Sequence, residues 1–203
     1  MKNKMKYLKK LITQYIDIEE QEWQELTSKF QKVTAKKGDV ISNAGDIFSD
    51  FYFIESGLAR SYFTDLNGKD FTWQIYFRGK SKYGLNHFMD DSVSYYENDA
   101  SMLHFEVLED SLFYKISLKE MDNFLENADK KWEHLARIWL HDTYFSSTYK
   151  RVISLMSENV EKRYNRLLLE YPDIFKKVKS YHIATFLGIA PQTLSKLRKN
   201  EPK

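Results

Sequence analysis

The sequence contains no cysteine among its 203 residues. This absence excludes disulfide bonds, thiolate zinc sites, cysteine-ligated iron–sulfur clusters and a cysteine nucleophile. Only seven glycines are present, too few for phosphate-cradling loops, and no G-x-S-x-G nucleophile motif occurs. No apolar run approaches the roughly 20 residues that span a bilayer. The basic N-terminus has spaced apolar residues followed at once by acidic ones, which predicts an amphipathic helix rather than a signal peptide. We therefore expect a cytoplasmic protein with no membrane partner.

The charges are divided unevenly along the chain, although the net charge is only +2. Residues 150–203 carry 12 Lys and Arg against 5 Asp and Glu, whereas residues 1–149 carry 19 against 24. This division is typical of an acidic sensing or scaffolding part joined to a basic part that meets a polyanion. The alternative is a tail that is basic by chance, and charge alone does not decide between the two.

The order of apolar patterns predicts helices, then strands, then helices again. Residues 5–30 have helical spacing with a bend near Asp17, where Asp17 and Glu20 resemble a capping box. Between 31 and 117, short aromatic-rich runs alternate with turn signals, of which Asn67-Gly68 predicts a type I′ hairpin. Residues 103–117 read as two strands about a Leu-Glu-Asp turn. The predicted fold class is α+β, with an antiparallel jelly roll flanked by helices.

A long helix is expected from about 129 to 160, after a shorter helix over 117–128. Apolar residues repeat every seven positions within it, which favours a two-stranded coiled coil and hence a homodimer. The two sets of positions are Leu135, Asp142, Tyr149 and Met156, and Ile138, Phe145 and Val152. The alternative is that this stripe packs on the chain's own sandwich, and Asp142 weakens the coiled coil. We predict three parts: a sensor domain over 1–128, a dimerisation helix over 129–157 and a DNA-binding domain over 158–203.

The segment "HIATFLGIAPQTLSKLRK", residues 182–199, has helical spacing that Gly188 and Pro191 interrupt. It is explained by a helix over 180–187, a turn over 188–190 and a second helix over 191–199. Gly188 suits the left-handed conformation that ends a helix, and Pro191 suits a first helical turn. The small core between the helices is predicted to contain Ala184 at their crossing and Ile183, Leu187, Ile189, Leu194 and Leu197.

The remaining residues of the second helix are polar, as in a helix-turn-helix whose second helix enters the major groove of double-stranded DNA. We predict Gln192 as the first base reader, with Thr193, Ser195 and Lys196 beside it. Arg198 and Lys199 are predicted to hold phosphates. Lys176, Lys177 and Lys179 either add backbone contacts or belong to a solvated loop.

This order of parts resembles the Crp/Fnr family of bacterial transcription regulators. Residues 45–77 are similar to its G-D…Y-F-I…G-x-x-R stretch, 107–125 to its hinge helices, and 161–199 to the C-terminal region of a branch common in Bacteroidetes. The resemblance implies a cyclic nucleotide-binding-like roll, a homodimer and a palindromic operator. It adds RNA polymerase and a small-molecule effector as candidate partners. The sequence ends soon after the second helix, so we expect DNA contacts without a full wing.

Two departures from the family bear on the effector. Cyclic AMP-binding members have a Gly-Glu pair and an Arg-Ser pair, but here Leu85 follows Gly84, and residues 99–102 contain no arginine. Acidic residues nearby would repel a phosphate, so we expect no response to cyclic AMP. His87 and His104 are weak haem candidates, because isolated histidines are more often core or surface residues. No metal or other cofactor is therefore predicted.

The sensed molecule is not identified by the sequence. A set of aromatic residues either lines a pocket or forms the core of the sandwich: Phe51, Phe53, Tyr62, Phe71, Trp73, Tyr76, Tyr83, Tyr95 and Tyr96. Two rival functions are a ligand-binding or protein-interaction module without DNA binding, and a cupin-like metalloenzyme. The metalloenzyme needs two or three converging histidines, and only His87 and His104 lie in the β region. We predict that the protein is not an enzyme.

Overall fold

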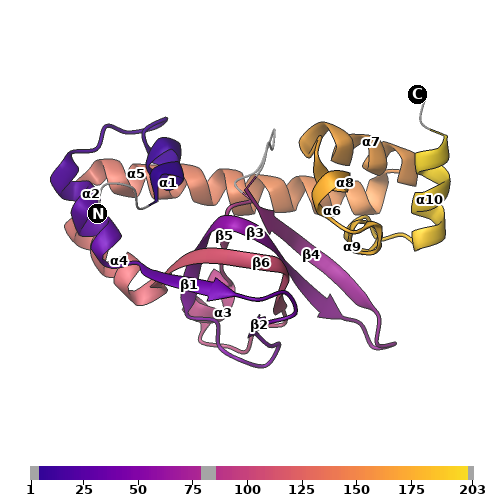
Figure 1. Cartoon of the computed structure of the whole chain (residues 1–203), viewed down its shortest axis with the longest axis horizontal. Coiled ribbons are helices and arrows are strands. Elements are labelled where there is room, and N and C mark those ends of the chain that lie inside the picture. Colours follow the sequence, from indigo (N-terminus) through magenta and orange to yellow (C-terminus); the bar gives the residue numbers. More distant parts are fainter. Residues whose placement is uncertain (1–4, 79–85, 201–203) are drawn as a thin grey trace.

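The computed structural model describes residues 5–78 and 86–200 and places an antiparallel sheet between two groups of helices (Figure 1). The N-terminal helices and strands are α1 (Lys6–Ile12), α2 (Glu20–Ser28), β1 (Gln31–Ala35), β2 (Val40–Ser42), β3 (Asp50–Thr64), β4 (Asp70–Phe77), β5 (Phe88–Met89), α3 (Ser92–Glu97) and β6 (His104–Ser117). The C-terminal helices are α4 (Leu118–Asn127), α5 (Lys130–Trp139), the π-helical segment η1 (Leu140–Ser146), α6 (Ser147–Ser157), α7 (Val160–Glu170), α8 (Ile174–Lys177), α9 (Ser180–Phe186) and α10 (Pro191–Lys199). This confirms the predicted α+β class. Within the described residues, no helix combines the length and apolar character that crossing a bilayer requires.

The N-terminal segment forms two helices separated by a bend, as predicted. The capping box lies two residues further along than expected, because residues 17–19 stay non-helical. The Glu22 carboxylate accepts a hydrogen bond of 2.8 Å from the backbone N–H of Glu19. The apolar faces of both helices are buried, so they cover one side of the sheet.

The sheet is built around β3, which pairs with β6 on one side and with β4 on the other. Successive side chains of a strand point to opposite faces. Tyr52 and Ile54 accordingly lie in the apolar interior of the roll, whereas Phe53 lies in the cluster beneath α1 and α2. Both faces of this strand are therefore buried.

Residues 103–117 are not two strands but one continuous strand, β6, from His104 to Ser117. In place of the predicted turn the strand pair has an irregular stretch. The pairing of β6 with β3 shifts register there, between Ile54 and Ala59 of β3. In this stretch Gly57 comes so close to β6 that a Cβ atom on it would lie 2.1 Å from the Ser111 Oγ. The close approach lets the Leu58 N–H donate to the Ser111 hydroxyl at 3.1 Å.

The β3–β4 hairpin lies where Asn67-Gly68 predicted it, but the turn is not type I′. Only Gly68 of this pair has positive φ, at +75°. The Gly68 N–H donates to the Asp65 carbonyl, and the Asp65 N–H donates to the Lys69 carbonyl, both at 2.9 Å. These bonds define a three-residue loop that ends in a left-handed glycine. The Asp65 carboxylate stabilises it by accepting the N–H groups of Asn67 and Lys69, both at 2.9 Å.

The long helix changes character along its length, as Figure 1 shows behind the sheet. Leu135 is buried in the cluster beneath α1 and α2, so its predicted place on a dimer seam is wrong. The π-helical segment then interrupts the seven-residue register at Asp142, which pairs with His141 at 2.9 Å. Beyond it, Phe145 and Tyr149 are 68% and 61% exposed. The alternative that the whole stripe packs on the chain's own sandwich is therefore wrong for α6.

We expect Gly57→Ala to destabilise the fold far more than Gly38→Ala. Both glycines have positive φ, which costs an alanine about 1 kcal/mol. A Cβ atom at Gly38 meets nothing within 4 Å, whereas one at Gly57 meets the β6 backbone at 2.6 Å. The added crowding should cost a further ~2 kcal/mol or more in the free energy of unfolding. Urea denaturation of both variants measures this difference, and equal losses would contradict the close approach.

Candidate nucleic-acid interface

The turn between α9 and α10 has the hydrogen bonds of a Schellman motif. The Ile189 N–H donates to the Ala184 carbonyl at 3.0 Å, and the Gly188 N–H donates to the Thr185 carbonyl at 3.1 Å. Gly188 has φ of +68°, a conformation that glycine adopts without steric cost. The predicted role of Gly188 is confirmed, and α9 ends at Phe186 with Leu187 as its C-cap.

Helix α10 begins at Pro191, as the sequence predicts. Ala190 before it is extended, with φ of −71° and ψ of 147°, the conformation that a following proline imposes. Proline costs little at this position because the first N–H groups of a helix have no partner within it. Four residues, 187–190, therefore join the two helices.

The apolar residues between α9 and α10 form a small core, as expected. Ile183, Ala184 and Leu194 are fully buried, and Leu187 and Ile189 are nearly so. Leu197 is partly buried against the same cluster. Since Leu194 is held at the centre, the opposite side of α10 is turned to solvent.

The predicted DNA-reading residues occupy that outer side of α10. Gln192, Ser195, Lys196 and Lys199 are exposed, and Thr193 is half-buried. These four exposed side chains come from one helix face, as their spacing of three and four residues requires. They present amide, hydroxyl and ammonium groups, which match base edges and phosphates.

Arg198 departs from this outer group. Its Nη1 donates to the Ser180 hydroxyl at 3.3 Å, and its guanidinium lies 4.5 Å from the centre of the Phe175 ring. The side chain therefore folds back toward the start of α9. Among the preceding lysines, Lys176 pairs with Asp173 at 2.8 Å, while Lys177 lies 5.8 Å from the Phe77 ring.

Arg151 of α6 joins α9 to the sheet, a role for which there was no signal in the sequence. Its guanidinium donates to the carbonyls of Thr72 at 2.8 Å and Phe186 at 3.0 Å, and also to that of Trp73. It lies 4.0 Å from the centre of the Phe186 ring. Burial lowers the pKa of Arg151 to about 10, which keeps the group charged at neutral pH.

A second contact joins α9 to β4 through buried hydroxyls. Thr72 and Thr185 are 0% and 2% exposed, and their Oγ1 atoms are 2.6 Å apart. Thr72 also accepts a hydrogen bond of 3.3 Å from Arg60. Arg60 in turn pairs with Asp70 at 3.0 Å and Glu106 at 2.8 Å. A polar network therefore runs from the middle of the sheet to α9.

The aromatic residues that the sequence analysis singled out in the N-terminal part lie partly in the core and partly around cavities. Phe53 and Tyr76 are buried in core clusters, whereas Phe51 and Tyr96 line a cavity beneath the N-terminal helices. Tyr62 stacks on His104 at 5.0 Å. Of the predicted set, Tyr83 lies outside the described residues, as do Gly84 and Leu85 of the cassette.

Two histidines that the sequence raised as ligands have structural partners. His87 Nε2 lies 3.1 Å from the Tyr7 hydroxyl, and His104 Nδ1 accepts the Ala44 N–H at 3.2 Å. Within the described part of the chain, no group of three candidate metal ligands comes together.

Two adjacent acidic residues, Asp90 and Asp91, belong to the segment that the sequence analysis compared with the phosphate cassette. Asp90 is 8% exposed, and burial together with Asp91 raises its pKa to about 7. The Asp91 carboxylate accepts a 2.6 Å hydrogen bond from Ser101. This corner contains two carboxyl groups and, among the described residues 90–102, no arginine that could hold an anionic phosphate.

Comparison with solved structures places this arrangement among known folds. A variant of CooA from Carboxydothermus hydrogenoformans aligns with a TM-score of 0.65 and 14% identity, covering 92% of this chain and 85% of that one. FixK2 from Bradyrhizobium japonicum aligns with a TM-score of 0.67 and 13% identity over 84% and 83% of the two chains. A protein assigned to the crp/fnr family of regulators, from Eubacterium rectale, aligns with a TM-score of 0.61 and 17% identity over 90% and 83%.

The chain has the Crp/Fnr fold. No protein-family model matches the sequence, and no curated protein matches it at a significant level. Sequence identities this low establish a shared fold but not shared site residues. The likeness therefore extends to the order of sheet, long helix and helix-turn-helix and no further.

The pH dependence of stability offers a test of how α9 of this Crp/Fnr fold packs. Burial, and then the nearby Arg60, lower the pKa of His182 from 6.5 to about 4. Below pH 6.5 His182 is protonated in the unfolded chain but stays neutral in the folded chain until the pH approaches 4. The stability that His182 contributes above pH 6.5 is therefore lost as the pH falls toward 4. We expect His182→Gln to lose less unfolding free energy than the parent across this window.

Urea denaturation at pH 7 and pH 5 measures that loss. His141→Gln is the matched control, because His141 is an exposed imidazole, 65% accessible. His87, whose pKa burial also lowers to about 4, contributes to the loss that remains in the His182 variant. An unchanged loss in His182→Gln would show that His182 is not packed against the sheet.

Proposed function

We propose that this chain is a sequence-specific DNA-binding transcription regulator that acts as a homodimer. The observation that carries the proposal is the α9–α10 unit, whose buried core turns one polar helix face to solvent. The excess of positive charge over residues 150–203 favours a polyanionic partner. The shared fold with regulators supports the same function.

In this proposal α10 enters the major groove with its N-terminal end toward the bases. Gln192, Thr193, Ser195 and Lys196 read base edges, because amide, hydroxyl and ammonium groups match their donors and acceptors. Lys199 and Arg198 hold phosphates. Arg198 reaches a phosphate by giving up its 3.3 Å bond to Ser180, an exposed contact that is readily exchanged.

The dimer forms through α6 and the end of the π-helical segment. Phe145, Tyr149, Val152 and Met156 follow each other at intervals of four, three and four residues and are all exposed in the single chain. This spacing is the apolar seam of a paired helix. The seam is shorter than the sequence predicted, since it begins beyond residue 142. The resulting two-fold dimer would read a palindromic operator with half-sites about one helical turn apart.

For the parts of the regulator, the proposal keeps the division that the sequence predicts. Residues 1–128 form the sensor domain, 129–157 the dimerisation helix and 158–203 the DNA-binding domain. The acidic corner around Asp90 and Asp91 supports a regulator that does not respond to cyclic AMP. RNA polymerase is the further partner that a promoter-bound regulator would meet.

The base-reading role is tested on the full chain with a fragment selected from genomic DNA. We expect Gln192→Ala and Lys196→Ala each to cost roughly 1–3 kcal/mol of specific binding, because each removes a contact to a base edge. Gel-shift titration against the selected fragment and a scrambled one measures the specific part. The parent should bind the selected fragment at least ~1000-fold more tightly.

Lys32→Ala is the control, since Lys32 is an exposed lysine on the distant strand β1. If no genomic fragment binds above the nonspecific level, or if the α10 variants bind as the parent does, the DNA-binding role is wrong.

The dimer is tested by Phe145→Glu, which places a charge in the proposed seam. We expect the solution mass to fall from that of a dimer to that of a monomer, because a buried unpaired carboxylate is strongly disfavoured. Light scattering during size-exclusion chromatography measures the mass. Leu66→Glu is the matched control: Leu66 is fully exposed at the tip of the β3–β4 hairpin and should leave the mass unchanged. A monomeric parent, or a dimeric Phe145 variant, would contradict this seam.

A further inference from the structure

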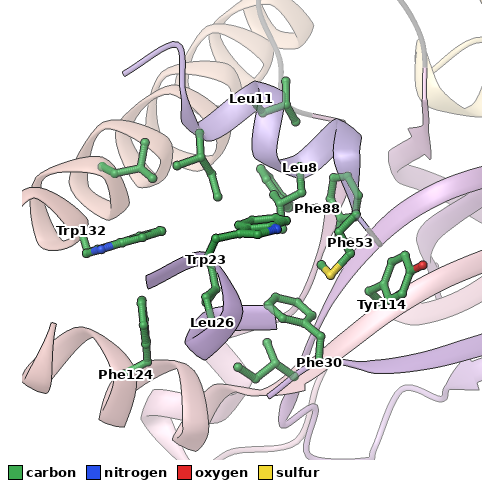
Figure 2. Packing of buried hydrophobic residues seen from close by; sticks show 14 of the residues in the cluster. Leu8, Leu11, Trp23, Leu26, Phe30, Phe53, Phe88, Tyr114, Phe124 and Trp132 are labelled. Atoms are coloured by element: carbon green, nitrogen blue, oxygen red, sulfur yellow. The ribbon is translucent and has the colours of Figure 1, made fainter. Parts of the chain in front are cut away.

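A cavity of 160 Å³ lies between the N-terminal helices, the hinge helices α4 and α5, and the sheet. Figure 2 shows the side chains of Leu8, Leu26, Phe124 and Trp132 converging on this region from α1, α2, α4 and α5. Phe88 of β5 closes it on the side of the sheet. The cavity walls are therefore almost entirely aliphatic and aromatic carbon.

This cavity is separate from the interior of the roll. Most of its lining residues belong to the cluster that packs under α1 and α2. The roll interior is filled by another cluster, which contains Ile54, Phe105 and Phe113, each of them 0% exposed. A molecule in the cavity would thus touch helices on the outer side of the sheet rather than strands inside the roll.

The entrance is on the side of α3 and the long helix. Most lining residues are buried, but Tyr96 and Leu140 are 64% and 52% exposed. The carboxylates of Asp90 and Asp122 also line the cavity, and the Tyr96 hydroxyl donates to Asp122 at 2.6 Å. An anion entering here meets two acidic groups.

One polar atom in the wall has no partner. The indole of Trp139 packs on Phe88 with ring centres 4.8 Å apart, and its Nε1 is buried without a hydrogen-bond partner in the described part of the chain. A buried N–H without an acceptor is rare in folded proteins and points to a missing group. Because Trp139 lines the cavity, we infer that an oxygen or nitrogen acceptor on a molecule bound there would satisfy it.

We propose that this cavity binds a neutral aromatic molecule of one ring that carries an acceptor oxygen. An apolar protein cavity of about 150 Å³ is known to take up benzene, so the volume here matches a single ring. The Trp139 N–H donates to the oxygen of the ligand, and the apolar walls bury its ring. Carboxylic acids in their ionised form are disfavoured, because Asp122 is an acidic residue in the lining and the apolar walls do not solvate a charge.

A molecule bound in the cavity would contact the long helix directly. Ala136, Trp139 and Leu140 all line it, and Leu140 is the first residue of the π-helical segment. A bound ring therefore contacts the residue at which the helix changes from α to π. Ligand binding is measured without DNA. A negative result would therefore contradict the cavity proposal and leave the proposed DNA-binding function untouched.

The probe is p-cresol, titrated into the isotope-labelled full chain and followed by the indole N–H signals of its four tryptophans in nuclear magnetic resonance. We expect a saturable shift of the Trp139 signal. Intermolecular proton contacts are expected from p-cresol to the methyl groups of Leu8, Ile12 and Leu135, all of which line the cavity or its floor. The anion p-toluate should bind at least about tenfold more weakly, because carboxylates line the entrance.

Two variants test separately the hydrogen bond from the Trp139 N–H and the volume of the cavity. Trp139→Phe should weaken p-cresol about fivefold, the usual effect of one neutral hydrogen bond, and leave toluene unchanged. Trp73→Phe is the matched control, since Trp73 lines a different cavity beside Arg151. Ala136→Phe fills the space and should abolish binding of both probes. If Ala136→Phe does not fold, the intermolecular proton contacts between p-cresol and the parent protein show whether the ligand occupies this cavity.

Four results would overturn the proposal. These are no saturable shift up to the solubility limit of p-cresol, contacts to Ile54 or Val107 of the roll interior instead, undiminished binding by folded Ala136→Phe, or tighter binding of benzylamine than of p-cresol. The last result would mean that the acidic groups select a cation.

Discussion

The buried guanidinium of Arg151 ties together three parts of the chain that are far apart in sequence. The side chain extends from α6 and donates hydrogen bonds to two backbone carbonyls of β4 and to one in the last turn of α9. A guanidinium is suited to this because its donors form a rigid fork and it stays charged even when burial lowers its pKa. Removing it would leave backbone carbonyls buried without partners, which is costly. This side chain is the only one that bonds to backbone carbonyls of both β4 and α9 among the contacts described above, and it is central to how the helix-turn-helix is placed against the sheet.

The hydroxyl pair of Thr72 and Thr185 extends the same junction into the roll. Thr72 also bonds to Arg60, which two carboxylates hold in the middle of the sheet. The sheet and helix α9 are thus linked through a continuous set of buried polar contacts. A change in the position of β4 would be felt directly by α9, since the contact is short and both hydroxyls are excluded from water.

The long helix joins the two halves in a different way. Its first part is covered by the chain's own N-terminal helices, its last part exposes an apolar face that contains Phe145 and Tyr149, and the π-helical segment lies between the two. The wider turn of a π segment shifts which residues face outward. Leu135 can for this reason face the chain's own core while Phe145 and Tyr149 face outward. A strict seven-residue repeat cannot describe a helix whose winding changes along its length.

Local chemistry in the sequence determined the helix-turn-helix and the general order of elements. Gly188 and Pro191 have conformational preferences that hold in almost any surroundings, so the turn and the start of α10 were predictable to the residue. Apolar spacing likewise gave the small core around Leu194 and, by exclusion, the outer polar face. The hairpin position followed from Asn67-Gly68, although the turn type did not, because the Asp65 carboxylate favours another loop.

Tertiary structure decided the features that depend on partners distant in sequence. Residues 103–117 form one strand because β3 lies alongside and Gly57 permits close approach there, and no local signal contains that information. The roles of Arg151 and Thr72, the burial of Leu135 and the apolar cavity beneath α1 and α2 arise from the same cause. Each depends on which surfaces meet, and burial or exposure of a side chain is a property of the packed chain rather than of its own segment.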